Sequence, residues 1–219
     1  MRLLAFLFLL PISLSFAQVV SFGVKGGVPL LTPVDGYAQP ASASKRYTVG
    51  PMVEVALPFS FAVEVDALYR RVGYDTAAGG IAGVTNFRVR GNDWQLPILA
   101  KVYILPRISP VRLFVSGGYV LRYTSGIDVR LSGTTANLQT GQIQEFSFRA
   151  NDVSSYVKNN PVHGVAAGGG ARLKLGRLSV APEVRYTHWG GVTFDQYGPY
   201  GFGLQSKQNQ VDVLVGLTF

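Results

Sequence analysis

The sequence predicts an eight-stranded antiparallel transmembrane β-barrel, preceded by a cleaved signal peptide. Three observations lead to this fold class. The chain has positive mean hydropathy, many glycines and only 15% charged residues, but no apolar run beyond its first residues is long enough for a spanning helix. Apolar and polar residues instead alternate in eight segments. Long and short connections also alternate between these segments, as they do in bacterial membrane barrels.

The first 17 residues have the layout of a secretory signal peptide. Arg2 precedes an apolar stretch over residues 3–14, and the small residues Ser15 and Ala17 stand before Gln18. The stretch is shorter than the roughly 20 residues of a spanning helix, which argues against an uncleaved anchor. We therefore expect a signal peptide over residues 1–17 and one barrel domain over residues 18–219.

Charge and cysteine content narrow the classes of partner. The chain has no cysteine, which excludes disulfides, thiolate metal sites and the acylated cysteine of a lipoprotein. Without Arg2 it carries 19 basic and 12 acidic residues, a net charge near +7. For an exported chain we expect outer-membrane lipids, lipopolysaccharide phosphates and the barrel-assembly machinery as partners, and no nucleic acid. Basic residues that only solvate loops or line an interior are the alternative.

The last residues give the clearest strand. Odd positions from 211 to 219 are apolar, whereas Asp212 and Thr218 occupy the other phase. Side chains alternate between the two faces of a strand, so the apolar set shares one face. The sequence predicts a terminal assembly strand with the outward residues Val211, Val213, Val215, Leu217 and Phe219.

The other segments follow the same rule, with aliphatic side chains on one phase and charges on the opposite one. The expected strands span residues 20–30, 46–58, 61–71, 94–105, 111–124, 164–175, 178–188 and 208–219. Because apolar side chains must face lipid, the charges are expected to form a network inside the barrel. Its predicted members are Lys25, Glu54, Glu64, Asp66, Arg70, Lys101, Arg112, Arg122, Arg172, Lys174, Glu183, Arg185 and Asp212.

The connections predict the orientation. The short ones lie at 58–60, 106–110 and 176–177, and the long ones at 31–45, 72–93, 125–163 and 189–207. Periplasmic turns are short in this class of barrel, so both termini are expected in the periplasm and the long loops outside the bacterial outer membrane. Aromatic residues near the long-loop ends are expected at the membrane interface, namely Tyr47, Tyr69, Trp94, Tyr123, Tyr186 and Trp189.

Two features complicate this prediction. Pro51, Pro97 and Pro182 fall inside expected strands, where each removes a ladder hydrogen bond, so we expect local bulges. The long loops also contain strand-like pieces at 86–90, 127–131 and 146–149. These pieces are expected to extend the barrel wall as hairpins above the membrane. A ten-stranded barrel is the alternative.

Four short motifs carry a resemblance to a known family. They are FGVKGG at 22–27, WQLPILAK at 94–101, FVSGGY at 114–119 and PEVRY at 182–186. In order and spacing they are similar to strands of the small outer-membrane β-barrel family of OmpA/OmpX type, and the ending at Phe219 resembles the recognition strand of such barrels. The resemblance implies the fold and the location, whereas family members differ widely in function.

The sequence offers little catalytic chemistry. A small barrel that deacylates lipid A resembles this chain near His188, but that family has a serine two residues later, where this chain has Gly190. His163 lies in a long loop without metal-ligand spacing. The glycines at 164–170 fall in an expected strand, not at a helix start that could bind phosphate, and they suit close packing. We expect no enzyme activity and no cofactor.

The sequence predicts a monomeric, non-catalytic outer-membrane protein with a structural or loop-mediated role. An unidentified extracellular partner would meet aromatic residues in the long loops, which are Tyr37, Tyr74, Phe194, Tyr197, Tyr200 and Phe202. An eight-stranded barrel is narrow enough for side chains to fill it. Two alternatives stay open: a narrow porin-like channel that prefers anions, and a soluble periplasmic lipocalin-like carrier with the opposite strand polarity.

Overall fold

The computed structural model describes residues 20–31, 34–36, 42–43, 47–80, 83–104, 109–137, 140, 142–153, 157–194 and 204–219. The expected signal peptide and the loop residues Tyr37, Tyr197, Tyr200 and Phe202 lie outside these residues. No helix in the described part of the chain is long and apolar enough to cross a membrane.

The described residues form one closed ring of antiparallel strands. In ring order these are β1 (Val20–Pro29), β4 (Thr48–Ala56), β5 (Phe61–Asp66) with β6 (Leu68–Gly80), β7 (Gly83–Tyr103), β8 (Val111–Ala136), β10 (Val162–Leu175), β11 (Leu178–Trp189) and β13 (Asn209–Thr218). β5 and β6 are two halves of one wall strand, interrupted at Ala67. The ring therefore has eight strands, which confirms the predicted fold class.

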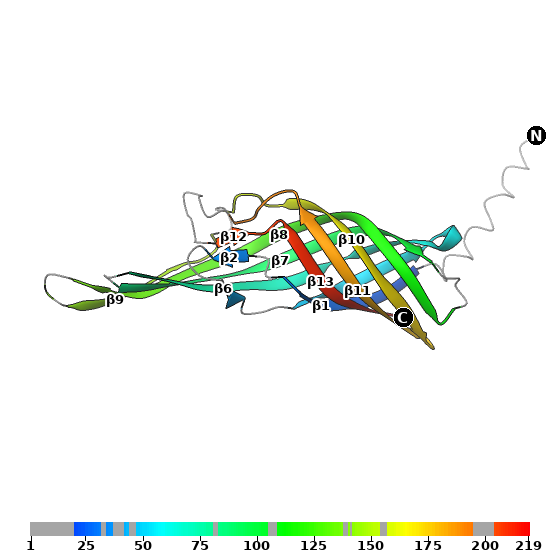
Figure 1. The fold of residues 1–219 in the computed structure, drawn as a ribbon, viewed down its shortest axis with the longest axis horizontal. Helices are drawn as coiled ribbons and strands as arrows, with labels where there is room; N and C mark the ends of the chain where they lie inside the picture. The colour runs from blue at the N-terminus through cyan, green and yellow to red at the C-terminus, as the bar shows by residue number, and fades with distance from the viewer. Residues whose placement is uncertain are drawn as a thin grey trace, which may run out of the picture.

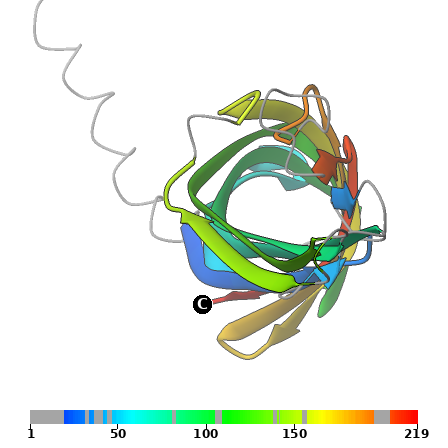
Figure 2. The ribbon, with the colours of Figure 1, turned by 90° about the vertical axis from the view of Figure 1, so that its left-hand side faces the viewer.

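The ring closes where the first strand meets the last. β1 and β13 pair from Gly23 opposite Thr218 to Pro29 opposite Asp212, and the backbone N–H of Phe219 donates to the carbonyl of Phe22. Figure 2, viewed along the barrel, shows the complete ring. Closure removes the unpaired edges that an open sheet would expose.

The remaining elements belong to the longer connections and to one turn. The short strands are β2 (Val34–Gly36), β3 (Ser42–Ala43), β9 (Ile143–Ala150) and β12 (Leu204–Ser206), and the turn η2 (Pro58–Ser60) is a short 3₁₀ segment. β3 pairs with β6, β9 with β8, and β12 with β2. The additional strands thus lengthen or cover the wall, and the ten-stranded alternative is wrong.

One side of the barrel is much taller than the other. β6 and β7 stay paired from Leu68 opposite Gln95 to Gly80 opposite Gly83, and β8 continues beside β7 and then pairs with β9. Figure 1 shows this extension at the end opposite the C-terminus. The strand-like pieces at 86–90, 127–131 and 146–149 lie in β7, β8 and β9. The prediction of wall-extending hairpins is confirmed.

The expected bulges at the prolines are wrong. Pro51 pairs in register with Val24, Pro97 with Val120 and Pro182 with Val215. The strand pairing keeps its register at each proline, because the missing N–H removes a hydrogen bond to only one of the two neighbouring strands. Opposite Pro51, for example, the ladder breaks at Ala67, whose own N–H still donates to the Pro51 carbonyl at 3.0 Å. The strands therefore pass the prolines without an inserted residue.

Candidate functional site

The strand phases place charges inside the barrel and apolar side chains outside it. Alternate residues of the wall are buried, whereas their neighbours are exposed on the outer surface. Phe22 is 63% exposed and Ile98 53% exposed, and similar apolar side chains surround the barrel. A protein interior normally has the opposite distribution, because burying charge costs more than burying hydrocarbon. The barrel interior, called the lumen below, is therefore the first candidate site.

Two lysines and a shared glutamate form the centre of the lumen. Lys25 of β1 and Lys101 of β7 both donate hydrogen bonds to Glu64 of β5, whose side chain is 0% exposed. Lys25 Nζ also lies 2.9 Å from Glu183 Oε2 and 3.5 Å from Asp66 Oδ2. Each of these central charges thus has an opposite charge beside it, the condition for tolerating burial.

Arg185 of β11 connects the same carboxylates from the other side. Its guanidinium donates to Glu183 Oε1 at 2.8 Å, to Asp66 Oδ2 at 3.0 Å and to Glu64 Oε1 at 3.1 Å. Because β11 and β5 lie on different parts of the ring, the ion pairs with Asp66 and Glu64 cross the lumen. They link opposite walls and occupy the space between them.

Toward the short connections, aromatic rings join the charges. Glu54 accepts a hydrogen bond from the Tyr103 hydroxyl at 2.9 Å and from Arg172 Nη1 at 2.7 Å. The guanidinium of Arg112 lies 3.9 Å from the centre of the Tyr103 ring, a cation–π contact. Phe114 packs against Tyr103, and a Cβ on Gly170 would come within 2.7 Å of the Phe114 ring. This glycine therefore makes room for an inward aromatic residue.

Toward the tall end, a second group of polar residues fills the lumen. Asp93 accepts hydrogen bonds from Arg70 Nη2 at 2.9 Å and from the Thr124 hydroxyl at 2.5 Å. Gln210 donates to Asp212 Oδ2 at 2.7 Å. The sequence does not predict Asp93 as a member of the charge network, because the expected strand begins one residue later, at Trp94.

Trp189 corrects one sequence-based expectation. It was expected among the interfacial aromatics, but its side chain is 0% exposed and points into the lumen. Its Nε1 donates to Gln210 Oε1 at 3.2 Å, and Arg122 lies 4.3 Å from its ring centre. The physical reason is that β11 continues to residue 189, which has the same phase as the inward Arg185 and Thr187.

Apolar side chains close the lumen inside the tall wall. This inner apolar cap consists of Val72, Tyr74, Val89, Ile127, Val129, Val153 and Phe194. Tyr74 and Phe194 were expected as contact residues of the loops, but both are buried here and their rings meet edge to face. Burial raises the pKa of Tyr74 to about 12, so its hydroxyl stays neutral. The cavity between the inner apolar cap and Arg70 has a volume of about 10 Å³, which is near the lower limit for one water molecule.

The structure brings most of the predicted charge network together. Lys25, Glu54, Glu64, Asp66, Arg70, Lys101, Arg122, Glu183, Arg185 and Asp212 are buried. Arg172 and Arg112 are half-buried near the Tyr103 end of the lumen. Lys174 is exposed near the end of β10, where the wall no longer encloses it.

The remaining aromatic residues form a partly exposed outer belt. Tyr69 and Trp94 stand opposite each other with ring centres 5.2 Å apart, and Trp94 is paired with Tyr123. Tyr47, Trp94, Tyr123 and Tyr186 are exposed on the outer surface. The outward residues of the terminal strand, Val211, Val213, Val215, Leu217 and Phe219, are all half-buried or exposed on that surface.

Both histidines are exposed on the outer surface of the barrel. His188 is exposed, and its Nδ1 lies 2.8 Å from Asn209 Oδ1, which also accepts from the Tyr186 hydroxyl. The His163 ring contacts the Tyr119 hydroxyl on the outer surface. Among the described residues, no group of three or more histidines, aspartates or glutamates could hold a metal ion.

Neither a protein-family model nor a curated protein matches the sequence. Solved structures of small outer-membrane barrels do match it. Neisserial surface protein A is 10% identical, with 91% of this chain and 94% of that chain covered and a TM-score of 0.47. The N-terminal β-barrel domain of Pseudomonas aeruginosa OprF is 11% identical, with 91% and 97% covered and a TM-score of 0.38.

A third match is Ail, the attachment invasion locus protein of Yersinia pestis. It is 10% identical, with 92% of this chain and 97% of that chain covered and a TM-score of 0.34. Such distant matches transfer no ligand and no residue role to this chain.

Proposed function

We propose that this protein is an integral barrel of the bacterial outer membrane, with a structural or loop-mediated role and no catalytic activity. The observation that carries the proposal is the polarity of the wall. Ion pairs fill the inside, whereas apolar side chains such as Phe22 and Ile98 surround the outside. An apolar surface of this extent is unfavourable in water and suits a hydrocarbon environment.

The same polarity argues against a soluble lipocalin-like carrier. A carrier needs an apolar cavity inside its barrel and a polar outer surface. Here the centre of the lumen holds Lys25, Glu64 and Arg185, and these side chains bond to one another. A hydrophobic ligand would have to break these ion pairs and leave buried charges without partners.

The filled lumen also argues against a channel. Ion pairs cross it at the level of Glu64, and the inner apolar cap lies above Arg70 and Asp93. An ion would have to separate buried pairs and then pass an apolar layer. The proposed role is therefore in the stability of the membrane or in contacts made by the tall wall, which extends far beyond the rest of the barrel (Figure 1).

The two tryptophans allow a direct test of membrane insertion. Trp94 lies on the outer surface and Trp189 lies in the lumen. In vesicles that contain brominated lipid, the variant W189F, which keeps only Trp94, should lose most of its fluorescence. The variant W94F, which keeps only Trp189, should be quenched far less. Equal quenching of both variants, or no insertion into vesicles, contradicts the proposal.

Conductance separates the proposed role from the channel. Wild-type protein in a planar bilayer is expected to show little or no stepwise current at neutral pH, because the lumen is filled. The amount of inserted barrel should be measured in the same preparation by its heat-dependent shift in gel migration. Regular current steps from folded, inserted protein would favour the porin-like channel instead.

A further inference from the structure

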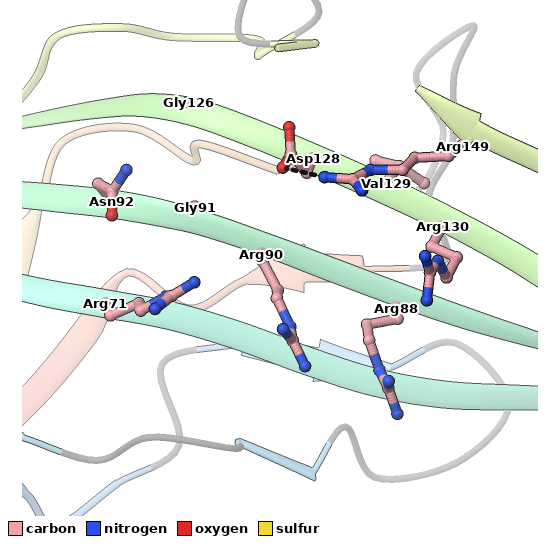
Figure 3. A pocket seen from close by; sticks show the side chains of 10 residues that line it. All are labelled: Arg71, Arg88, Arg90, Gly91, Asn92, Gly126, Asp128, Val129, Arg130 and Arg149. Atoms are coloured by element: carbon pink, nitrogen blue, oxygen red, sulfur yellow. Dashed lines mark hydrogen bonds and ion pairs between the residues drawn. The ribbon is translucent and has the colours of Figure 1, made fainter. Parts of the chain in front are cut away.

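The outer surface of the tall wall carries a group of arginines. Figure 3 shows Arg71 on β6, Arg88 and Arg90 on β7, Arg130 on β8 and Arg149 on β9 around one shallow depression. We call these five residues the arginine patch. The depression has a volume of about 260 Å³, and Asp128 is the acidic residue among those that line it.

A bulge in β8 places part of the patch on this surface. Asn92 pairs with Ser125 but Arg90 pairs with Asp128, so β8 holds one extra residue at this point. Gly126 has φ +58°, the left-handed conformation that glycine adopts readily in such bulges. The extra residue reverses the phase of β8. Ile127 and Val129 consequently enter the inner apolar cap, and Asp128 and Arg130 turn outward.

Like charges in the patch stand directly opposite one another. Arg88 pairs with Arg130, and Arg130 pairs with Arg149, which gives three arginines in one row across β7, β8 and β9. Like charges at opposing positions repel each other. Two carboxylates offset part of this charge, since Asp75 binds Arg88 at 2.5 Å and Asp128 lies 3.4 Å from Arg149.

Three members of the patch have no such partner. Arg71, Arg90 and Arg130 are exposed and form no ion pair or hydrogen bond with a described side chain. Five guanidinium groups face two carboxylates, so the patch has an excess of three positive charges. Guanidinium groups bind phosphate through paired, charge-assisted hydrogen bonds, which makes an anion with several phosphates a fitting ligand.

The height of the patch identifies the source of that anion. Arg71 follows Tyr69 by two residues on the same outward phase, and Arg90 precedes Trp94 by four. With about 3.4 Å per strand residue, they lie about 7 Å and 14 Å along the strands above the aromatic belt. Tyrosine and tryptophan mark the boundary between hydrocarbon and head groups. The lower part of the patch is thus at the level of lipid head groups.

We propose that the arginine patch binds the phosphorylated head group of lipopolysaccharide in the outer leaflet, beside the barrel wall. The proposal rests on the proposed function, because it requires the aromatic belt to lie at the membrane surface. Arg71 and Arg90 would contact phosphates next to the acyl chains, and the row of Arg88, Arg130 and Arg149 would contact acidic groups farther out. The binding is electrostatic and should weaken as salt concentration rises.

The test compares two double variants in phospholipid nanodiscs. R71Q/R90Q removes two charges from the patch, and K174Q/R177Q removes two exposed charges at the opposite end of the barrel. Bisphosphorylated lipid A is titrated into each, and Trp94 fluorescence reports binding in a W189F background. The patch variant should bind about tenfold more weakly than the parent protein, whereas the control should bind within twofold of it.

Several outcomes would overturn the proposal. They are unchanged binding by R71Q/R90Q, an equal loss in K174Q/R177Q, and equal affinity for lipid A without phosphates. Inorganic phosphate that competes at low millimolar concentration would indicate a site for the free ion, and tighter binding of a sulfated polysaccharide would indicate a soluble polyanion. If the protein does not insert into bilayers at all, the proposed function fails. If it inserts and lipid A binding ignores the patch, only this inference fails.

Discussion

At the scale of single residues, Glu64 holds the lumen together. Its carboxylate contacts Lys25, Lys101 and Arg185, which come from three different strands. Removing one member of a buried ion-pair network lowers the stability of the fold by more than the intact pair adds to it. The reason is that the remaining charges stay buried without a partner. With three cations around it, Glu64 is a position where a substitution is expected to disturb the interior.

The substitution E64Q is therefore expected to destabilise the barrel by about 3 kcal/mol or more, since it leaves three buried cations with one carboxylate fewer. Urea unfolding in lipid vesicles, followed by tryptophan fluorescence, measures the free energy of unfolding. The matched control is E145Q on β9, where the glutamate is exposed and the expected change is within about 0.5 kcal/mol. Similar unfolding midpoints for the two variants would contradict this role of Glu64.

The sequence predicts the direction of individual side chains better than their partners. Strand alternation indicates that Lys25 and Glu64 face inward, but it cannot show that they meet across the lumen, because the contact depends on the register of strands far apart in the chain. Trp189 shows a different difficulty. The alternation of residues 178–188, continued by one residue, predicts that Trp189 faces inward. The tendency of tryptophan to lie at membrane interfaces predicts that it faces outward.

At the scale of elements, β8 has two parts with different phases. Before Gly126, the odd-numbered residues of β8, such as Tyr123, face outward. After Gly126, the even-numbered residues face outward, as Arg130 does. The sequence alone predicts strand-like alternation on both sides of Gly126. It does not show that the phase changes between them, because a bulge appears only when the pairing with β7 is known. The bulge accounts for the outward position of Arg130, whereas Arg88, Arg90 and Arg149 fall in segments that the sequence assigns to long connections.

Variants of Gly126 test the bulge. G126V should destabilise the tall wall by about 1–2 kcal/mol, because a β-branched residue is strained at positive φ. G126N should have a much smaller effect, since asparagine tolerates this conformation and an added Cβ would meet only the Asn92 side chain, at 3.1 Å. Hydrogen exchange at Ile127 and Val129 measures local opening. Equal exchange in both variants would show that the left-handed conformation is unimportant.

At the scale of the whole molecule, the connections give the barrel a direction. The turn η2 and the Gly176–Arg177 turn lie at one end, and the β8–β9 hairpin extends from the other. The alternation of short and long connections predicted this arrangement from the sequence, because such lengths are set by which side of the membrane a connection occupies. The sequence does not predict how far the tall wall extends, since irregular loops and paired strands can have similar composition.

Single cysteines would test the proposed orientation, and the natural chain contains no cysteine that could interfere. F59C lies in η2 and E145C lies on β9, both at exposed positions. In intact cells a membrane-impermeant maleimide should label E145C and not F59C. After the outer membrane is permeabilised, both should react. Labelling of F59C in intact cells would place the short turns outside and contradict the proposal.

The pairing of β1 with β13 also has a consequence for how the protein folds. Gly23 and Thr218 are partners although nearly the whole described chain lies between them. Contacts between such distant residues form slowly, because ordering a long loop precedes any gain from the contact. Until the last strand arrives, β1 has an unpaired edge and the lipid-facing side chains are exposed, a state prone to aggregation. We therefore expect the unclosed chain to aggregate in water unless another protein covers these surfaces until the ring is complete.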